Sequence, residues 1–154
     1  MAKYTYLIVG GGMTAAAAVA GIREVDKKGD IGLISTESHK PYNRPPLSKG
    51  LWKGDALDSI WRKMDEQGVA LHLGRTVTKL DARKKQVTDD QGATHDYGKL
   101  LLATGCTTRR LPFGEGRINY FRTLDDYQQL RSQTENGQRF AVIGRGVQGA
   151  LELV

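Results

Sequence analysis

The chain has 154 residues, a net charge of +6 and 39% hydrophobic residues, which are the proportions of a globular protein rather than of a disordered tail. Its one cysteine, Cys106, excludes an intrachain disulfide, and the three histidines stand far apart in the sequence without metal-ligand spacing. The basic residues are scattered, and no apolar run approaches membrane-spanning length. We therefore expect no binding to nucleic acid or membranes. We also expect a cytoplasmic location, because the first strand leaves no room for a signal peptide.

The chain opens with the pattern of a βαβ unit. Residues 4–10 form a short β-rich run that ends in glycine, as a buried parallel strand does. The alanine-rich stretch that follows predicts a helix that reaches Lys27 and Lys28 and stops at Gly29. Residues 30–35 predict a second buried strand. Strand, glycine turn, helix and strand within about thirty residues indicate an α/β nucleotide-binding fold.

The middle of the chain changes from irregular to strand-forming sequence. Residues 39–54 are rich in proline and too irregular for a plain strand or helix, and residues 57–67 predict a helix. Short strands are expected at residues 69–73, 76–82, 85–90 and 93–105. The sequence Asp-Asp-Gln-Gly between the last two is a hairpin signal, so these strands predict an antiparallel β element.

After Gly105 the sequence predicts a linker and a short helix, and then a second strand–glycine–helix pattern like the one at the start of the chain. Residues 123–134 predict a short helix, in which Thr123 and Asp126 have the spacing of a capping box. A strand over residues 138–144 then leads into new glycines. The chain ends partway through the helix that these glycines would start. We therefore interpret Val154 as a boundary within a longer protein, and the fold as incomplete.

The first glycine turn has the spacing of a dinucleotide-binding site. Gly10, Gly12 and Ala15 form G-x-G-x-x-A between a strand and a helix. The first glycine permits a tight turn, the second leaves space for a pyrophosphate, and the third small residue lets helix and strand pack closely. The helix amino terminus would offer free N–H groups to the phosphates. Glu37, preceded by Thr36, is the acid expected on the ribose hydroxyls, and a solvated loop carboxylate is the alternative.

A second glycine motif follows the expected strand at residues 138–144. Gly144, Gly146 and Gly149 form G-x-G-x-x-G. Two dinucleotide motifs in one chain suggest two cofactors, one permanent and one exchanging. The alternative is a helix-start turn that binds no ligand.

A longer motif carries a family resemblance. Pro-Tyr-Asn-Arg-Pro-Pro-Leu-Ser-Lys-Gly-Leu-Trp, residues 41–52, follows Ile-Val-Gly-Gly-Gly and Leu-Ile-Ser-Thr-Glu. Leu-Leu-Ala-Thr-Gly with Arg109 four residues later comes next, and Phe-Arg-Thr-Leu-Asp-Asp-Tyr-Gln-Gln-Leu-Arg precedes the second glycine motif. In this order the motifs resemble the ferredoxin/rubredoxin reductase and apoptosis-inducing-factor branch of the FAD-dependent pyridine nucleotide-disulfide oxidoreductases. The resemblance covers nearly the whole chain.

The resemblance implies a Rossmann-like FAD/NAD(P)-binding fold and a reductase. FAD would occupy the first site and NAD(P)H the second, with hydride passing to FAD and electrons then to a ferredoxin or rubredoxin. Lys49 would lie near the reactive edge of the flavin and stabilise its developing negative charge, whereas without the motif it would be an ordinary exposed lysine. The residues implied to contact FAD are Gly10, Gly12, Met13, Ala15, Thr36, Glu37, Arg44, Pro45, Lys49, Val77, Ala103, Thr104, Gly105 and Arg109.

The resemblance also implies a domain plan. Residues 1–110 would be the first half of the FAD-binding domain, residues 111–136 a linker with a short helix, and residues 137–154 the start of the NAD(P)H-binding domain. Relatives place a glutamate where this chain has Leu151, with Glu152 one position later. The 154 residues alone are expected to be inactive, to hold FAD weakly or not at all, and to self-associate through an exposed sheet edge.

Other functions remain compatible with the glycine motifs. One is a dehydrogenase that uses NAD alone, and another is a non-enzymatic nucleotide-binding or interaction module. A disulfide reductase of the glutathione or thioredoxin type is disfavoured, because one thiol cannot form a redox pair. The sequence leaves open the choice between NADH and NADPH.

Overall fold

The computed structural model describes residues 2–114, 116–134, 139 and 141–142. The chain divides into two compact units. The first comprises residues 1–43 and 61–105, and the second comprises residues 44–60 and 106–154. The chain thus leaves the first unit for residues 44–60 and returns to finish it.

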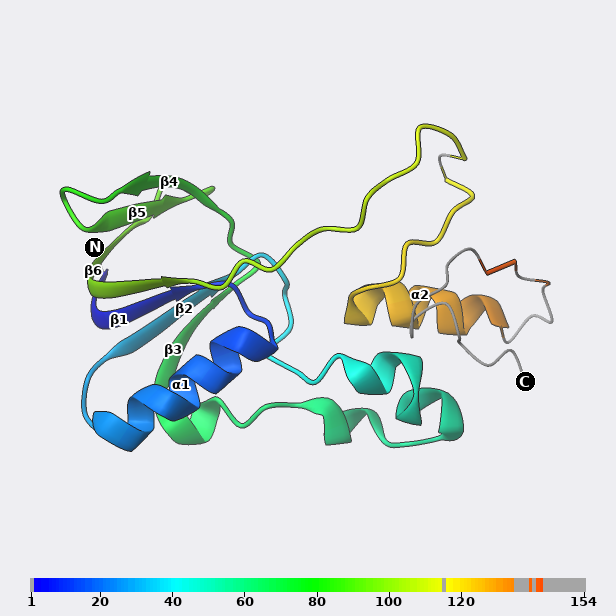
Figure 1. The fold of residues 1–154 in the computed structure, drawn as a ribbon, viewed down its shortest axis with the longest axis horizontal. Helices are drawn as coiled ribbons and strands as arrows, with labels where there is room; N and C mark the ends of the chain where they lie inside the picture. The colour runs from blue at the N-terminus through cyan, green and yellow to red at the C-terminus, as the bar shows by residue number, and fades with distance from the viewer. Residues whose placement is uncertain (1, 115, 135–138, 140, 143–154) are drawn as a thin grey trace. The chain divides into compact units, whose positions relative to one another are not determined.

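A six-stranded sheet forms the first unit, in the order β3-β2-β1-β6-β5-β4 (Figure 1). Its strands are β1 (Ala2–Val9), β2 (Ile31–Ser35), β3 (Val69–Leu73), β4 (Val77–Asp81), β5 (Gln86–Asp89) and β6 (Thr94–Leu102). β3, β2, β1 and β6 run parallel, and β5 and β4 extend the sheet in antiparallel fashion. The predicted α/β fold, with a parallel sheet and an antiparallel element, is confirmed.

Helix α1 (Met13–Val25) covers one face of the parallel strands (Figure 1). Its buried residues Ala15, Ala16 and Val19 pack in one cluster with Ile8 of β1 and Leu33 of β2. Alanine side chains let the helix backbone approach the sheet closely. Because each fully buried aliphatic side chain contributes about 1.5–3 kcal/mol, this face is a principal source of the unit's stability.

The opposite face of the sheet carries a second, smaller core. Leu7, Ile34 and Val87 are buried together there, with Tyr97 and Leu100 packed against them. Figure 1 shows β4 and β5 on the side of the sheet away from α1, which brings Val87 of β5 over the parallel strands. Both faces of the central strands are therefore apolar, as expected of a parallel sheet.

The predicted hairpin joins β5 to β6. Gly92 has φ +77°, a conformation that favours glycine, and the Asp89 carboxylate accepts hydrogen bonds from the backbone N–H groups of Gln91 and Ala93. The turn predicted from Asp-Asp-Gln-Gly is thus present, with the aspartate and the glycine in the roles that such turns require.

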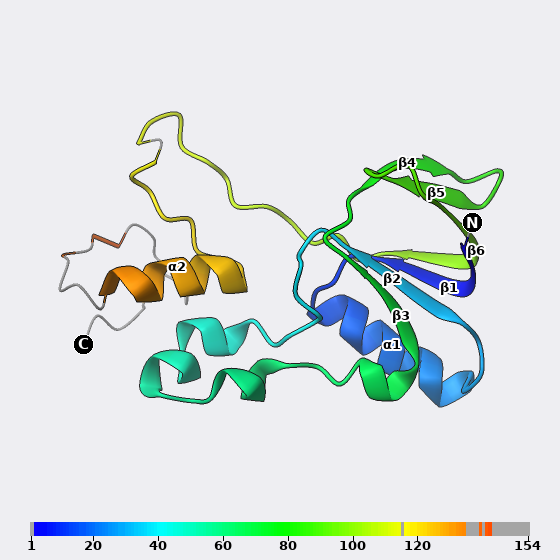
Figure 2. The same ribbon diagram turned by 180° about the vertical axis from the view of Figure 1, so that it is seen from behind.

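The described residues of the second unit form 3₁₀ turns and one α-helix. The proline-rich block forms 3₁₀ helices at Pro45–Ser48 and Gly50–Lys53, and another lies at Leu57–Ile60. Helix α2 (Leu124–Thr134) begins with the predicted capping box, in which Thr123 Oγ1 accepts from Asp126 N at 3.2 Å and Asp126 Oδ2 accepts from Thr123 N at 2.7 Å. Figure 2 shows the same helix from behind. The residues described between Cys106 and Arg122 form neither helix nor strand, as predicted for the linker.

The tyrosine of α2 ties the two segments of the second unit together. The ring of Tyr127 meets that of Trp52 edge-on at 5.3 Å, and its hydroxyl donates to Leu51 O at 3.2 Å. Arg131 lies over the other ring of this pair, 5.3 Å from the centroid of Trp52. These contacts join the 3₁₀ helices of the proline-rich block to α2.

Two local predictions are wrong. The helix expected over residues 57–67 is two short 3₁₀ turns, because Trp61 between them pairs with Tyr42 in a β-bridge. Helix α1 stops at Val25 and not near Gly29. There the Asp26 side chain accepts hydrogen bonds from the N–H groups of Lys28 and Gly29, and this turn replaces the last helical turn.

Candidate functional site

The turn between β1 and α1 requires glycine at its first position. Gly10 has φ +122°, and a Cβ there would lie 2.1 Å from the carbonyl oxygen of Ala103. Its N–H donates to Ile34 O at 2.8 Å. Gly10 therefore sits where the carboxyl ends of β1, β2 and β6 meet, at the point where the strand order switches sides. Ligands of open α/β sheets bind at such switch points.

The second glycine of the motif has no packing reason to be glycine. Gly12 caps α1 with φ −86° and ψ −172°, which any residue can adopt, and no atom lies within 4 Å of its Cβ position. Among the described residues no side chain caps this end of α1, and the first turn contains no acid. Free N–H groups beside open space are what an anionic group needs. The residues present therefore fit a bound pyrophosphate.

The remaining members of the first motif lie as the spacing predicts. Ala15 is fully buried between α1 and the sheet, so its small size serves helix–strand packing. Met13 begins α1 and is exposed.

The predicted ribose residues follow the end of β2. Thr36 is exposed, and its hydroxyl pairs with that of Thr76 at 3.3 Å. Glu37 is half-buried, and its Oε2 accepts a hydrogen bond from the hydroxyl of Tyr42 at 2.6 Å. The backbone at Glu37 is held too, because its carbonyl accepts from Gly74 N at 3.1 Å.

The predicted residues on β4 and after β6 belong to the same unit. The side chain of Val77 packs into the second core, which leaves its backbone as the part able to meet a ligand. Ala103 is joined to β1 by its N–H, which donates to Val9 O at 2.8 Å. Thr104 and Gly105 are exposed and continue from this edge. The first unit thus brings together all the site residues predicted from its own segments.

The other predicted residues lie in the second unit. Arg44 donates to the carbonyl of Arg122 at 2.9 Å, and Pro45 starts the first 3₁₀ helix. Lys49 is exposed at the junction of two 3₁₀ helices, and Arg109 is exposed in the linker. The expected strand before the second glycine motif falls mostly on residues that the structure does not describe. Gly144, Gly146 and Gly149, with Leu151 and Glu152, also lie outside the described residues.

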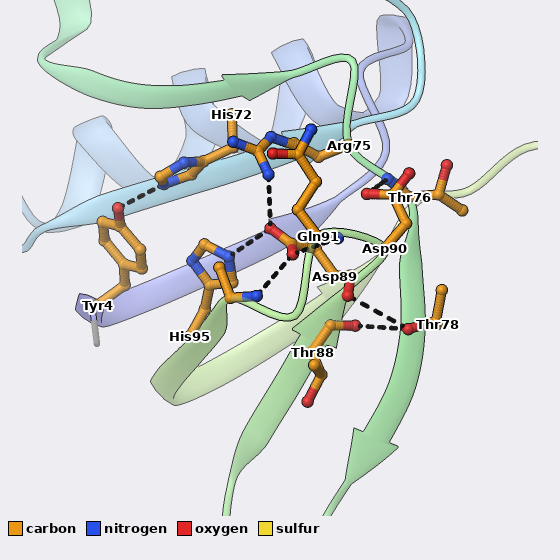
Figure 3. A network of polar contacts seen from close by, with 11 residues as sticks. Tyr4, His72, Arg75, Thr76, Thr78, Thr88, Asp89, Asp90, Gln91 and His95 are labelled. Carbon is orange, nitrogen blue, oxygen red and sulfur yellow. Dashed lines mark hydrogen bonds and ion pairs between the residues drawn. The ribbon is translucent and has the colours of Figure 1, made fainter.

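Sequence reasoning missed a polar cluster on the sheet. Figure 3 shows His72 of β3, His95 of β6 and Asp89 of β5 converging with Tyr4 and Arg75. The Tyr4 hydroxyl lies 2.6 Å from His72 Nε2, His95 Nε2 lies 3.2 Å from Asp89 Oδ2, and the two imidazole centroids are 4.7 Å apart. Arg75 Nη1 completes the cluster at 3.8 Å from Asp89 Oδ2. The histidines are far apart in sequence, and only the strand pairing brings them together.

The surroundings of Asp89 and His72 lower the pKa values of both side chains. Burial favours a higher pKa for Asp89, but hydrogen bonds from His95 and the N–H groups of Ala93 and Gln91 outweigh it and hold that pKa below 3.8. Burial lowers the pKa of His72 below 6.5, and the neighbouring His95 adds to the effect. At neutral pH Asp89 is therefore charged and His72 is neutral. Among the described residues, Nδ1 of His95 is buried without a hydrogen-bond partner.

The cluster steadies the loop that precedes β4. It lines an open depression of about 420 Å³, and among the described residues no group of His, Cys, Asp or Glu has an arrangement that would hold a metal ion. Next to it, Thr76 N donates to Asp90 Oδ1 at 3.1 Å and Asp90 N donates to Thr76 O at 2.8 Å. Since Val77 follows directly, the network fixes the backbone at one of the predicted site residues.

Comparisons with known proteins agree with this geometry. Residues 4–152 match the family described as pyridine nucleotide-disulphide oxidoreductase. The ferredoxin–NAD(+) reductase component of the p-cumate 2,3-dioxygenase system of Pseudomonas putida is 37% identical over 93% of this chain and 37% of its own length. Rubredoxin–NAD(+) reductase of Pseudomonas putida is 32% identical over 93% of this chain and 39% of its own length.

A solved structure shares the fold. The crystal structure of NADH:rubredoxin oxidoreductase from Clostridium acetobutylicum superposes with a TM-score of 0.83 at 25% identity, over 97% of this chain and 40% of that one. The chain therefore spans well under half the length of the proteins it matches. Within the part of the chain that the structure describes, no helix has the length and apolar character needed to cross a bilayer.

Proposed function

The chain belongs to the pyridine nucleotide-disulphide oxidoreductase family, and from this premise we propose that it is part of an FAD-dependent NAD(P)H reductase. NAD(P)H gives a hydride, two electrons and a proton, to FAD, and the two electrons then leave one at a time to a ferredoxin or rubredoxin. The observation that carries the proposal is the open space at Gly12 beside the uncapped amino terminus of α1. The names of the relatives support the acceptor class.

In this proposal the first unit binds the ADP half of FAD. Gly10, Gly12, Met13 and Ala15 form the pyrophosphate turn, in which the backbone N–H groups of α1 meet the phosphates. Thr36 and Glu37 bind the ribose, and the Val77 backbone meets the adenine. Ala103, Thr104 and Gly105 pass beside the cofactor at the end of β6.

The second unit supplies the cationic residues in the same proposal. Arg44, Pro45 and Arg109 lie along the cofactor, and Lys49 lies by the flavin, whose reduction builds negative charge that a nearby ammonium group stabilises. Lys49 is exposed in this chain, so its ammonium group is not buried by the described residues. Replacing it by glutamine is expected to slow flavin reduction about tenfold, whereas Lys53→Gln in the next 3₁₀ helix serves as the matched control.

The proposed domain plan follows the two glycine motifs. Residues 1–110 form the first half of the FAD-binding domain, residues 111–136 form the linker and short helix, and residues 137–154 begin the NAD(P)H-binding domain. Gly144, Gly146 and Gly149 would bind the pyrophosphate of NAD(P)H. Since the chain spans well under half the length of the proteins it matches, the 154 residues alone are expected to bind FAD weakly and to be inactive.

The exposed apolar residues of β6 support the proposed self-association of the isolated chain. Leu101 and Leu102 are 37% and 57% exposed at the carboxyl end of this central strand. Consecutive strand residues point to opposite faces of a sheet, so each leucine adds exposed apolar surface to its own face, and such surface favours association of copies. Static light scattering over a concentration series measures this directly, and a monomer at every concentration contradicts it.

The absorption spectrum of the intact protein tests the proposed function. Flavin bands that bleach when NADH is added without oxygen are the expected result, since they report the cofactor and its reduction together. Two other functions make different predictions. An NAD-only dehydrogenase has no flavin bands, and a non-enzymatic binding module has flavin bands that NADH leaves unchanged.

A further inference from the structure

The acid proposed for the ribose is held by a buried tyrosine. Glu37 follows β2 by two residues, and the hydroxyl of Tyr42 donates a hydrogen bond to its Oε2 at 2.6 Å. Tyr42 is only 2% exposed, so its hydroxyl reaches the carboxylate from within the protein. A short bond from a neutral donor to a carboxylate is of the stronger, charge-assisted kind.

Neither partner of this pair is free to move independently. Tyr42 forms a β-bridge with Trp61, and the two rings meet edge-on at 6.1 Å with an angle of 86° between their planes. Beside the bridge, Arg62 N donates to Pro41 O at 2.9 Å. The backbone of Glu37 is anchored as described above. The tyrosine hydroxyl is thus a fixed point to which the carboxylate is attached.

A fixed carboxylate has a consequence for binding. A glutamate on a surface loop samples many rotamers. When a ligand needs one of them, fixing that rotamer costs side-chain entropy and makes the free energy of binding less favourable. A carboxylate can accept about four hydrogen bonds on its two oxygens, so a bond from Tyr42 is compatible with bonds from ribose hydroxyls. We infer that Tyr42 is a positioning residue, which holds Glu37 ready for the ribose hydroxyls of the dinucleotide.

This inference rests on the proposed function, and a double-mutant cycle in the intact protein tests it. Tyr42→Phe keeps the buried ring and removes the hydroxyl, and Glu37→Ala removes the carboxylate. The matched control is Tyr6→Phe, which removes a tyrosine–carboxylate bond of 3.1 Å to Asp26 at the other end of α1. The dissociation constants of FAD and of FMN, which lacks the adenosine ribose, are measured by flavin fluorescence, and melting temperatures are recorded alongside.

The expected result is a pattern that a purely structural bond does not give. Tyr42→Phe weakens FAD about tenfold, which corresponds to about 1.4 kcal/mol, and leaves FMN binding unchanged. In the Glu37→Ala background the same change weakens FAD by less than about twofold, because the acceptor of the Tyr42 bond has already been removed. Tyr6→Phe lowers the melting temperature and leaves FAD affinity as in the wild type.

Other outcomes overturn the inference. One such outcome is that Tyr42→Phe binds FAD as tightly as the wild type. Another is that Tyr42→Phe weakens FAD binding by the same factor whether or not Glu37 is present. Either result shows that the bond between Tyr42 and Glu37 does not affect FAD binding. Wild-type FAD affinity in Glu37→Ala alone overturns it even when the Tyr42 variant does not fold. Failure of the proposed function appears differently, as a wild-type protein without flavin or without bleaching by NADH; absence of flavin overturns both.

Discussion

The two glycines of the first motif should respond to substitution in opposite ways. Alanine at position 10 places its Cβ 2.1 Å from a backbone carbonyl oxygen that has no freedom to move away, in a residue with φ +122°. Backbone strain of this kind costs about 1–3 kcal/mol, and the collision adds a comparable amount. We expect Gly10→Ala to lose about 4 kcal/mol of folding free energy, a large share of the stability of an ordinary domain.

Alanine at position 12 should leave the fold intact. Its backbone angles suit any residue, and no atom lies within 4 Å of its Cβ position. The folding free energy should therefore change by no more than about 0.5 kcal/mol. The added methyl group would instead occupy the space proposed for the pyrophosphate. Loss of one charge-assisted hydrogen bond of about 1.5–3 kcal/mol should weaken FAD by a factor of about 10–100.

Two measurements on each variant separate these effects. Urea denaturation followed by circular dichroism gives the folding free energy, and flavin fluorescence of the intact protein gives the FAD dissociation constant. The reasoning is refuted if Gly12→Ala binds FAD within a factor of two of the wild type. It is equally refuted if Gly10→Ala is as stable as the wild type, since the contact with Ala103 would then be absent.

Three further predictions concern stability. Because the pKa of Asp89 is held low, the folding stability that its carboxylate contributes is present above pH 3.8 and is lost as the pH falls below that value. Asp89→Asn should lose about 3 kcal/mol of folding free energy at neutral pH. It should also reduce the fall in stability at acid pH, which urea titrations at several pH values measure. Burial lowers the pKa of His72, so the stability that its neutral imidazole contributes is present above pH 6.5 and is lost as the pH falls below that value. His72→Gln should therefore flatten the dependence of the melting temperature on pH below 6.5, and an unchanged slope contradicts this. Arg23 donates to the carbonyls of Gln67, Gly68 and Gly29, and Arg23→Ala should lower the urea-derived folding free energy by about 2 kcal/mol, with no change in FAD affinity.

Local patterns were sufficient wherever short-range chemistry decides the structure. The glycine spacing around Gly10 predicted the turn, its strand and its helix. The capping box of Thr123 and Asp126 is present as predicted. Both of its hydrogen bonds join residues three positions apart, so the local sequence determines them. The hairpin after Asp89 also formed as read, since its aspartate and glycine favour one turn geometry.

Long-range pairing explains what the sequence did not reveal. His72 and His95 meet because β3 and β6 belong to one sheet, and no spacing along the chain signals that register. The segment around Trp61 has helical composition on each side, but its bridge to Tyr42 stabilises an extended backbone instead. The bond between Tyr42 and Glu37 joins residues only five positions apart, but no spacing rule signals it: the motif predicted an acid at this place but not which group orients it.

The interleaving of the two units has a consequence for synthesis on the ribosome. Residues 44–60 emerge long before α2, the helix whose Tyr127 packs on Trp52 and bonds to Leu51. At about 5–20 residues per second, α2 follows Ile60 by roughly 3–15 seconds. During that interval the sheet of the first unit can form, while Leu51 and Trp52 lack the Tyr127 side chain that contacts both in the folded protein. A nascent chain at this length offers chaperones an apolar segment that the mature protein conceals.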